Sequence, residues 1–144
     1  MLIECGAQIV ERLKACCPAA EGNVFLPGDV AGIKEKDQVT PALHVLLASY
    51  RPVDQDDGDG LWDEIYIVYA VVRHAAQRER TAGQMQAAQP LLQETLNALC
   101  AWRPAASSRE LTLVPPPQPN FSDHNAYFPL AFKARPITEI TGGN

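Results

Sequence analysis

The stretch that decides the fold spans 33 positions and consists of ALHVLLASYR (42–51), PVDQDDGDG (52–60) and LWDEIYIVYAVVRH (61–74). The last of these segments is the densest in β-branched and aromatic residues, which predicts a strand. The first is apolar at most positions and bounded by prolines, which predicts a central strand covered on both faces. Because a short loop rich in Gly and Asp joins them, we predict an antiparallel hairpin at the centre of the fold.

Helical periodicity is found on both sides of this hairpin. Residues 2–17 place apolar side chains at three- and four-residue steps, which predicts an amphipathic helix that Pro18 ends. A second helix is predicted within 83–102, where the apolar positions are Met85, Ala88, Leu92, Leu96 and Leu99. Pro90 lies inside this pattern. We expect the helix to start near it, because proline is tolerated at the first helical position; a kink there is the alternative.

Three shorter strands complete the predicted sheet. A short apolar run in 23–28 ends at a Pro-Gly turn, and a strand over 110–114 precedes a proline-rich segment that cannot lie inside a sheet. The last strand covers 126–134. The order α-β-β-β-α-β-β predicts an α+β fold, with one mostly antiparallel sheet of about four to five strands and two main helices on one face.

Length and composition predict an ordinary globular protein. With 144 residues, 47% of them apolar and 20% charged, we expect one domain over 1–144 with a frayed tail at 138–144. The formal net charge of −5 and the absence of a dense basic segment disfavour nucleic-acid binding. No segment has the run of about 20 apolar residues that a membrane span needs. We therefore expect a cytoplasmic protein without membrane contact.

The sequence offers no catalytic or cofactor motif. Its four cysteines lack the spacing of zinc sites or of disulfide frameworks, which predicts reduced thiols. A cysteine nucleophile would need a histidine beside it, and none of Cys5, Cys16, Cys17 and Cys100 has a recognisable nucleophile context. We expect these thiols to pack as small apolar side chains, and we predict no catalytic residue, no cofactor and no enzyme.

The acidic loop of the hairpin is the most charged segment, with Asp54, Asp56, Asp57 and Asp59. It resembles a calcium loop in composition but fails in register, because Gly58 stands where an oxygen ligand is required. We therefore predict a solvated loop and no metal site.

Two tryptophans are candidate interface residues. Trp62 begins the strongest strand, directly after the acidic loop, and is equally compatible with core packing and with an interface anchor. Trp102 ends the second predicted helix, and core packing is the favoured interpretation there.

A family resemblance rests on the order and the amino-acid sequences of several segments. These are IVERLKACCP, NVFLPGDVAGIKEKDQVTPALHVLLASYRPVD, IYIVYAVVRHA, LLQETLNALCAWRPA, LTLVPPPQP and YFPLAFKA. In this order they resemble the small tail terminator proteins of long-tailed phages and prophages, especially the Mu-like group, over most of the chain.

The resemblance implies a structural role in the virion tail or neck, assembled in the bacterial host cytoplasm. Subunits would form a homo-hexameric ring that caps the tail tube, stops its polymerisation and offers a surface to head completion proteins. DNA would pass through the lumen without specific binding, to which the acidic balance of the chain is suited. As a hypothesis within this role, Asp54, Asp56, Asp57 and Asp59 line this lumen or reach a partner. The family has no active-site residues.

Three alternatives stay open at the level of sequence. Another neck component, such as a head-closure or tail-completion protein, shares the α+β architecture and the ring symmetry. A small enzyme with a cysteine nucleophile and a monomeric binding domain are the other two.

Overall fold

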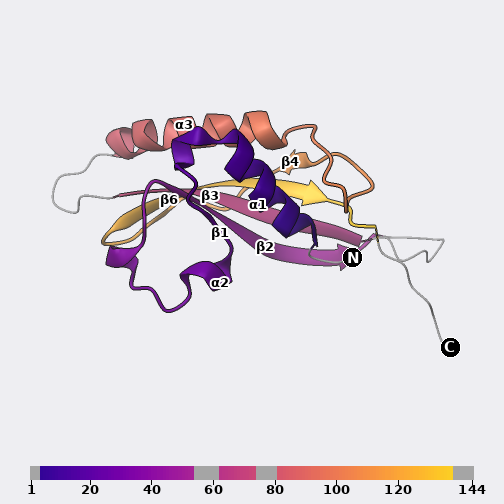
Figure 1. The fold of residues 1–144 in the computed structure, drawn as a ribbon, viewed down its shortest axis with the longest axis horizontal. Helices are drawn as coiled ribbons and strands as arrows, with labels where there is room; N and C mark the ends of the chain where they lie inside the picture. The colour runs from indigo at the N-terminus through magenta and orange to yellow at the C-terminus, as the bar shows by residue number, and fades with distance from the viewer. Residues whose placement is uncertain (1–3, 54–61, 74–80, 138–144) are drawn as a thin grey trace.

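The computed structural model describes residues 4–53, 62–73 and 81–137, and these form a sheet with helices (Figure 1). The helices are α1 (Glu4–Cys16), α2 (Pro27–Val30) and α3 (Thr81–Leu99), with 3-10 turns η1 (Pro18–Ala20) and η2 (Glu35–Asp37). The strands are β1 (Val24–Phe25), β2 (Ala42–Pro52), β3 (Trp62–Arg73), β4 (Thr112–Val114), β5 (Asn120–Phe121) and β6 (Asn125–Ala134).

The sheet is built around the predicted hairpin. Its strand order is β1-β2-β3-β6-β4, and β5 pairs with β6 beside β4. β2 and β3 are antiparallel from Ala42 opposite Val71 to Pro52 opposite Trp62. β1 is parallel to β2, and the other described pairs are antiparallel. The predicted α+β class and mostly antiparallel sheet are confirmed.

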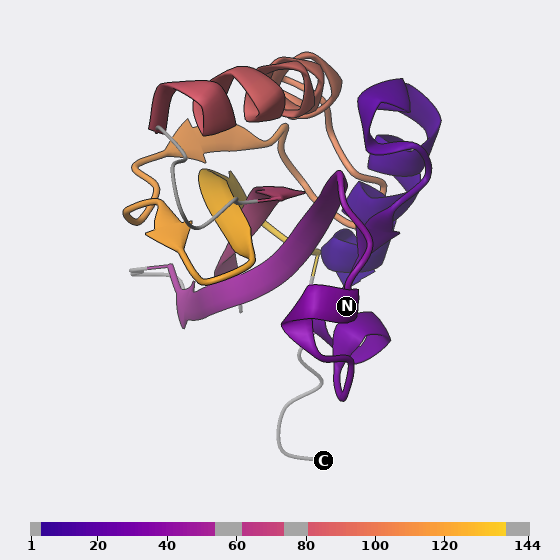
Figure 2. The same cartoon turned by 90° about the vertical axis from the view of Figure 1, so that its left-hand side faces the viewer.

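Both main helices cover one face of the sheet, as predicted (Figures 1 and 2). Alternate residues of β3 point toward them, because successive side chains of a strand face opposite sides. These are Tyr66, Val68, Ala70 and Val72, each at most 4% exposed. Gly6 brings α1 close to the sheet, because a Cβ there would lie 3.0 Å from Cε1 of Tyr66. The principal core therefore lies between the helices and the sheet.

The expected start of the second helix near Pro90 is wrong. α3 begins at Thr81 and contains Pro90 in its interior. Pro90 is exposed, so water can satisfy the carbonyl that loses its amide partner, while the buried Ala88 and Leu91 hold the helix on the sheet. The helix also ends earlier than predicted, at Leu99, because Ala101 adopts a left-handed conformation with φ of 63°.

The buried stripe of α3 is rotated by about one position from the predicted one. Met85 is 51% exposed, and Leu92 and Leu96 are only half-buried. The row that faces the sheet consists of Gln84, Ala88, Leu91, Thr95, Ala98 and Leu99. The small side chains in this row let α3 pack closely on the sheet. The free energy gained by this packing outweighs the cost of leaving the apolar side chain of Met85 exposed.

Besides the two 3-10 turns, one short helix and one short strand were absent from the prediction. The expected Pro-Gly turn is the helix α2, which has Pro27 at its first position, while the Asp29 carboxylate accepts a hydrogen bond from Leu26 N at 2.8 Å. β5 lies beyond the proline-rich segment and pairs with β6. β2 departs from the expected full coverage, because its residues from Ala48 to Pro52 are exposed.

Candidate functional site

The end of the β2–β3 hairpin carries the one predicted site residue that the structure describes. Trp62 is half-buried, and its ring lies 6.1 Å from that of Tyr50, centroid to centroid, at an angle of 49°. Tyr50 is 58% exposed and precedes the exposed Arg51 and Pro52. Aromatic residues and arginine are the side chains that most often dominate protein interfaces. The composition of the hairpin end therefore suits an interface, while Asp54, Asp56, Asp57 and Asp59 lie outside the described residues.

An ion pair joins the loop end of the hairpin to Arg135, the residue directly after β6. Arg135 Nε donates to Asp63 Oδ1 at 3.0 Å, and both side chains are largely buried, with 15% and 9% exposed. The pair crosses between neighbouring strands, because the adjacent residues Glu64 and Ala134 are register partners. The start of β3 is therefore held rigidly at the point where the acidic loop joins it.

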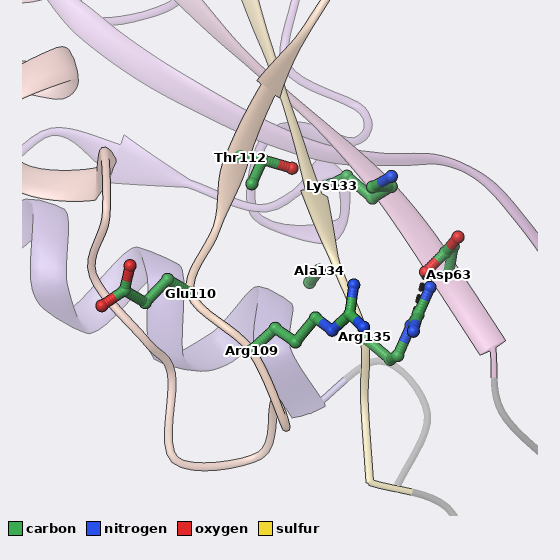
Figure 3. Close-up of a pocket in the computed structure, with 7 residues that line it drawn as sticks. All are labelled: Asp63, Arg109, Glu110, Thr112, Lys133, Ala134 and Arg135. Carbon is green, nitrogen blue, oxygen red and sulfur yellow. Dashed lines mark hydrogen bonds and ion pairs between the residues drawn. The ribbon is translucent and has the colours of Figure 1, made fainter.

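A small polar pocket adjoins this ion pair (Figure 3). Its volume of about 80 Å³ is enough for a few water molecules, and its lining includes Arg109, Glu110 and Lys133 beside the pair. Figure 3 shows Arg109 extending toward Arg135, whereas Glu110 points away from it. Such a pocket can hold water or a surface carboxylate, and it contains no histidine or cysteine to act as base or nucleophile.

Two of the four cysteines have raised thiol pKa values. Burial, aided by nearby Glu64, raises the pKa of Cys5 to about 11, and burial, aided by Glu94, does the same for Cys17. Both are thiols at neutral pH, which makes them poor nucleophiles. Cys16 is half-buried and Cys100 is exposed. The described ranges also contain no group of three or more His, Cys, Asp or Glu side chains placed to hold a metal ion.

The sheet face opposite the main helices carries a groove that the sequence analysis missed. We call it the helix-free groove; its volume is about 340 Å³, and its lining includes Leu26, Val30, His44, Leu46, Tyr69 and Tyr127. The nearly continuous apolar run of β2 could have indicated it, since a strand apolar at most positions needs cover on both faces. Among the described residues, the segments on this second face are short: α2, η2 and the connections beside them (Figures 1 and 2).

A carboxylate is hydrogen-bonded to Tyr127, one of the residues that line the helix-free groove. Glu35 Oε2 accepts hydrogen bonds from Ser122 Oγ and from the Tyr127 hydroxyl, each at 2.6 Å. Burial acts to raise the pKa of Glu35, but these hydrogen bonds outweigh it and lower the pKa below 4.5. They tie η2 to the β5–β6 turn and thereby fix the segment that borders the groove.

His44 lies within the helix-free groove in an aromatic setting. Its ring centroid lies 6.0 Å from that of Phe25 and 6.3 Å from that of Tyr127. Burial lowers its pKa, which favours the neutral imidazole. Nε2 is buried and has no hydrogen-bond partner among the residues that the structure describes. The groove thus combines apolar walls with one polar group whose hydrogen-bonding capacity is unused.

Comparison with known proteins gives one family. The family model described as phage tail terminator protein matches residues 2–141. No match was found among curated proteins.

No helix in the described segments has both the length and the hydropathy needed to cross a membrane.

Proposed function

The chain belongs to the phage tail terminator family, and from this premise we propose that it is the subunit of a ring that caps the tail tube. Membership makes it a structural component of the virion tail. In the proposal, six copies form the ring, the ring stops polymerisation of the tube protein, and its free side receives a head completion protein. Each copy contributes residues 1–144 as one domain, and assembly takes place in the cytoplasm of the bacterial host.

The observation that carries this proposal is the extent of the family match, which covers 2–141 of 144 residues. The charge of the chain supports it as well. A formal net charge of −5 repels phosphate, so DNA can pass through the lumen of such a ring without binding to it.

Native mass spectrometry over a concentration series, combined with negative-stain images, tests the ring. The expected result is a six-membered species with a central hole. Disrupting the gene in the phage or prophage that carries it tests the capping, because tubes without a terminator are expected to grow beyond their normal length. Tails of normal length after disruption would contradict the proposal.

Within this proposal the acidic loop lines the lumen or contacts a partner. The test replaces Asp54, Asp56, Asp57 and Asp59 with asparagine, which removes four charges at nearly constant side-chain size. Defective tail length or defective head joining is expected. If both stay normal, the loop has neither role.

Trp62 is proposed as an interface anchor. Trp62→Ala is expected to weaken assembly by about tenfold or more, because large aromatic side chains contribute much of the binding free energy at interfaces. Trp62→Phe is the matched control, since it keeps an aromatic ring next to Tyr50. The anchor role is rejected if Trp62→Ala lowers the thermal unfolding temperature while leaving assembly of the folded protein unchanged.

A further inference from the structure

The outer surface of α3 carries no charge. Its exposed residues include Met85, Gln86, Gln89, Pro90, Gln93 and Asn97. Glu94 is the sole charged residue between Thr81 and Leu99, and its carboxylate accepts a hydrogen bond from Ala19 N at 2.9 Å. Solvent-facing helix surfaces normally carry charged side chains, whereas the centres of protein interfaces are depleted in them. The outer surface of α3 therefore has the composition of an interface.

The residues that line the helix-free groove carry no charge either, and the Glu35 carboxylate next to them is held by hydrogen bonds from Ser122 and Tyr127. None of the lining residues is an acid, a lysine or an arginine, and their one ionisable imidazole, that of His44, is kept neutral by burial. Leu26, at the rim of the groove, is 36% exposed despite its apolar side chain. Grooves with apolar walls bind helices through the apolar side chains of the helix.

These two surfaces lie on opposite sides of the molecule. Figures 1 and 2 both place the sheet between α3 and α2, and α2 borders the groove. Two different surfaces on opposite sides of one subunit permit a head-to-tail contact, which closes into a ring when the rotation between subunits allows it. Copies with a net charge of −5 repel one another, so uncharged surfaces are where they can meet at the lowest electrostatic cost.

We propose that the outer surface of α3 in one copy docks into the helix-free groove of the next copy. This inference rests on the proposed ring and assigns its two contact surfaces. Met85, 51% exposed, is a large exposed apolar side chain in the N-terminal half of α3, and its unbranched shape adapts to an irregular groove. The flanking glutamine amides can both donate and accept hydrogen bonds at the polar groups of the groove, among them Asn120 and the Tyr127 hydroxyl.

The experiment places one lysine on each surface and one elsewhere. Met85→Lys charges the helix and Leu26→Lys charges the groove. Leu113→Lys on β4 is the matched control, because Leu113 is 51% exposed, as is Met85, and the same charge is added. Circular dichroism and thermal melts establish that each variant is folded, and native mass spectrometry over a concentration series measures assembly.

Met85→Lys and Leu26→Lys are each expected to raise the apparent dissociation constant of the assembly about tenfold or more, while Leu113→Lys changes it less than about twofold. An equimolar mixture of the two disrupted variants sharpens the test. A head-to-tail contact leaves one intact helix and one intact groove in the mixture, so heterodimers of one copy of each variant are expected, without larger rings.

Three outcomes would overturn the proposal. If Met85→Lys disrupts assembly but Leu26→Lys does not, and the mixture gives no heterodimer, α3 contacts α3 in a symmetric dimer. If only Leu113→Lys disrupts assembly, the contact lies at the sheet edge. If the wild-type chain stays monomeric at all concentrations, the head-to-tail contact does not form. Tube capping is tested separately, by the length of tails after gene disruption.

Discussion

The two faces of the sheet differ in how completely they are covered. On the face beneath α1 and α3, the inward residues of β2 and β3 are almost fully buried, as Leu43 and Tyr66 illustrate. On the opposite face, His44, Leu46 and Tyr69 are only partly buried and line a groove. Both faces are apolar, yet one is closed by long helices and the other by short segments. We therefore expect the side chains on the first face to contribute most of the folding stability. The second face offers most of the surface that is available for contacts.

The largest expected effect comes from truncating one leucine on each face of β2. Leu43 is 0% exposed in the core, whereas Leu46 lies on the other face and lines the groove. Leu43→Ala is expected to lower the free energy of unfolding by about 3 kcal/mol, and Leu46→Ala by about 1 kcal/mol. Urea denaturation of both variants measures the difference. Equal losses would show that the two faces contribute alike to stability and would end the comparison.

A smaller difference is expected from removing one hydroxyl on each face. Tyr66 donates to Glu64 Oε1 and Tyr127 donates to Glu35 Oε2, both at 2.6 Å. The first bond is buried and the second only partly so, which makes the loss of a partner more costly in the first case. Tyr66→Phe should lower the free energy of unfolding by about 2 kcal/mol and Tyr127→Phe by about 0.5 kcal/mol. A larger loss for Tyr127→Phe in urea denaturation would refute this ranking.

The smallest expected effect is a pH dependence on the groove side. Although burial acts to raise the pKa of Glu35, the hydrogen bonds from Ser122 and Tyr127 hold it below the ordinary value of 4.5. The resulting stabilisation is fully present above pH 4.5 and is lost as the pH falls through the lower pKa of the folded state. Glu35 is near the surface, so the change should stay below about 1 kcal/mol.

Unfolding free energies from pH 7 to pH 3 for the wild type and Glu35→Gln measure this contribution. The difference between the two proteins should shrink as the pH falls, because the wild-type carboxylate becomes protonated. A difference that stays constant over this range would assign the effect of the substitution to packing instead.

The hairpin was predictable because its signal is local. β-branched and aromatic residues crowd 65–72, and the Gly/Asp loop leaves the antiparallel arrangement as the simplest connection. The helix α1 was predictable for the same kind of reason, since its apolar positions recur at a helical period. The family resemblance also came from the sequence, and the match over 2–141 confirms it.

The start and the rotation of α3 could not be predicted from local rules. By local rules, a proline such as Pro90 is expected at the first turn of a helix. Pro90 lies inside α3 because Ala88 and Leu91 on either side of it pack against the sheet. Packing against the sheet likewise determines that Gln84 is buried and that Met85 is exposed. Local hydrophobicity favours Met85, and close packing favours the row of smaller side chains.

The sequence by itself determined the class of fold, the central hairpin and the family, because each depends on the order and periodicity of residues along the chain. Only the tertiary structure decided which sheet face stays open and that Glu35 and Ser122 meet Tyr127, a residue that lines the groove. The ion pair between Asp63 and Arg135 is also a feature that only the tertiary structure decided. These contacts join residues up to 92 positions apart, and no local pattern specifies such a distance.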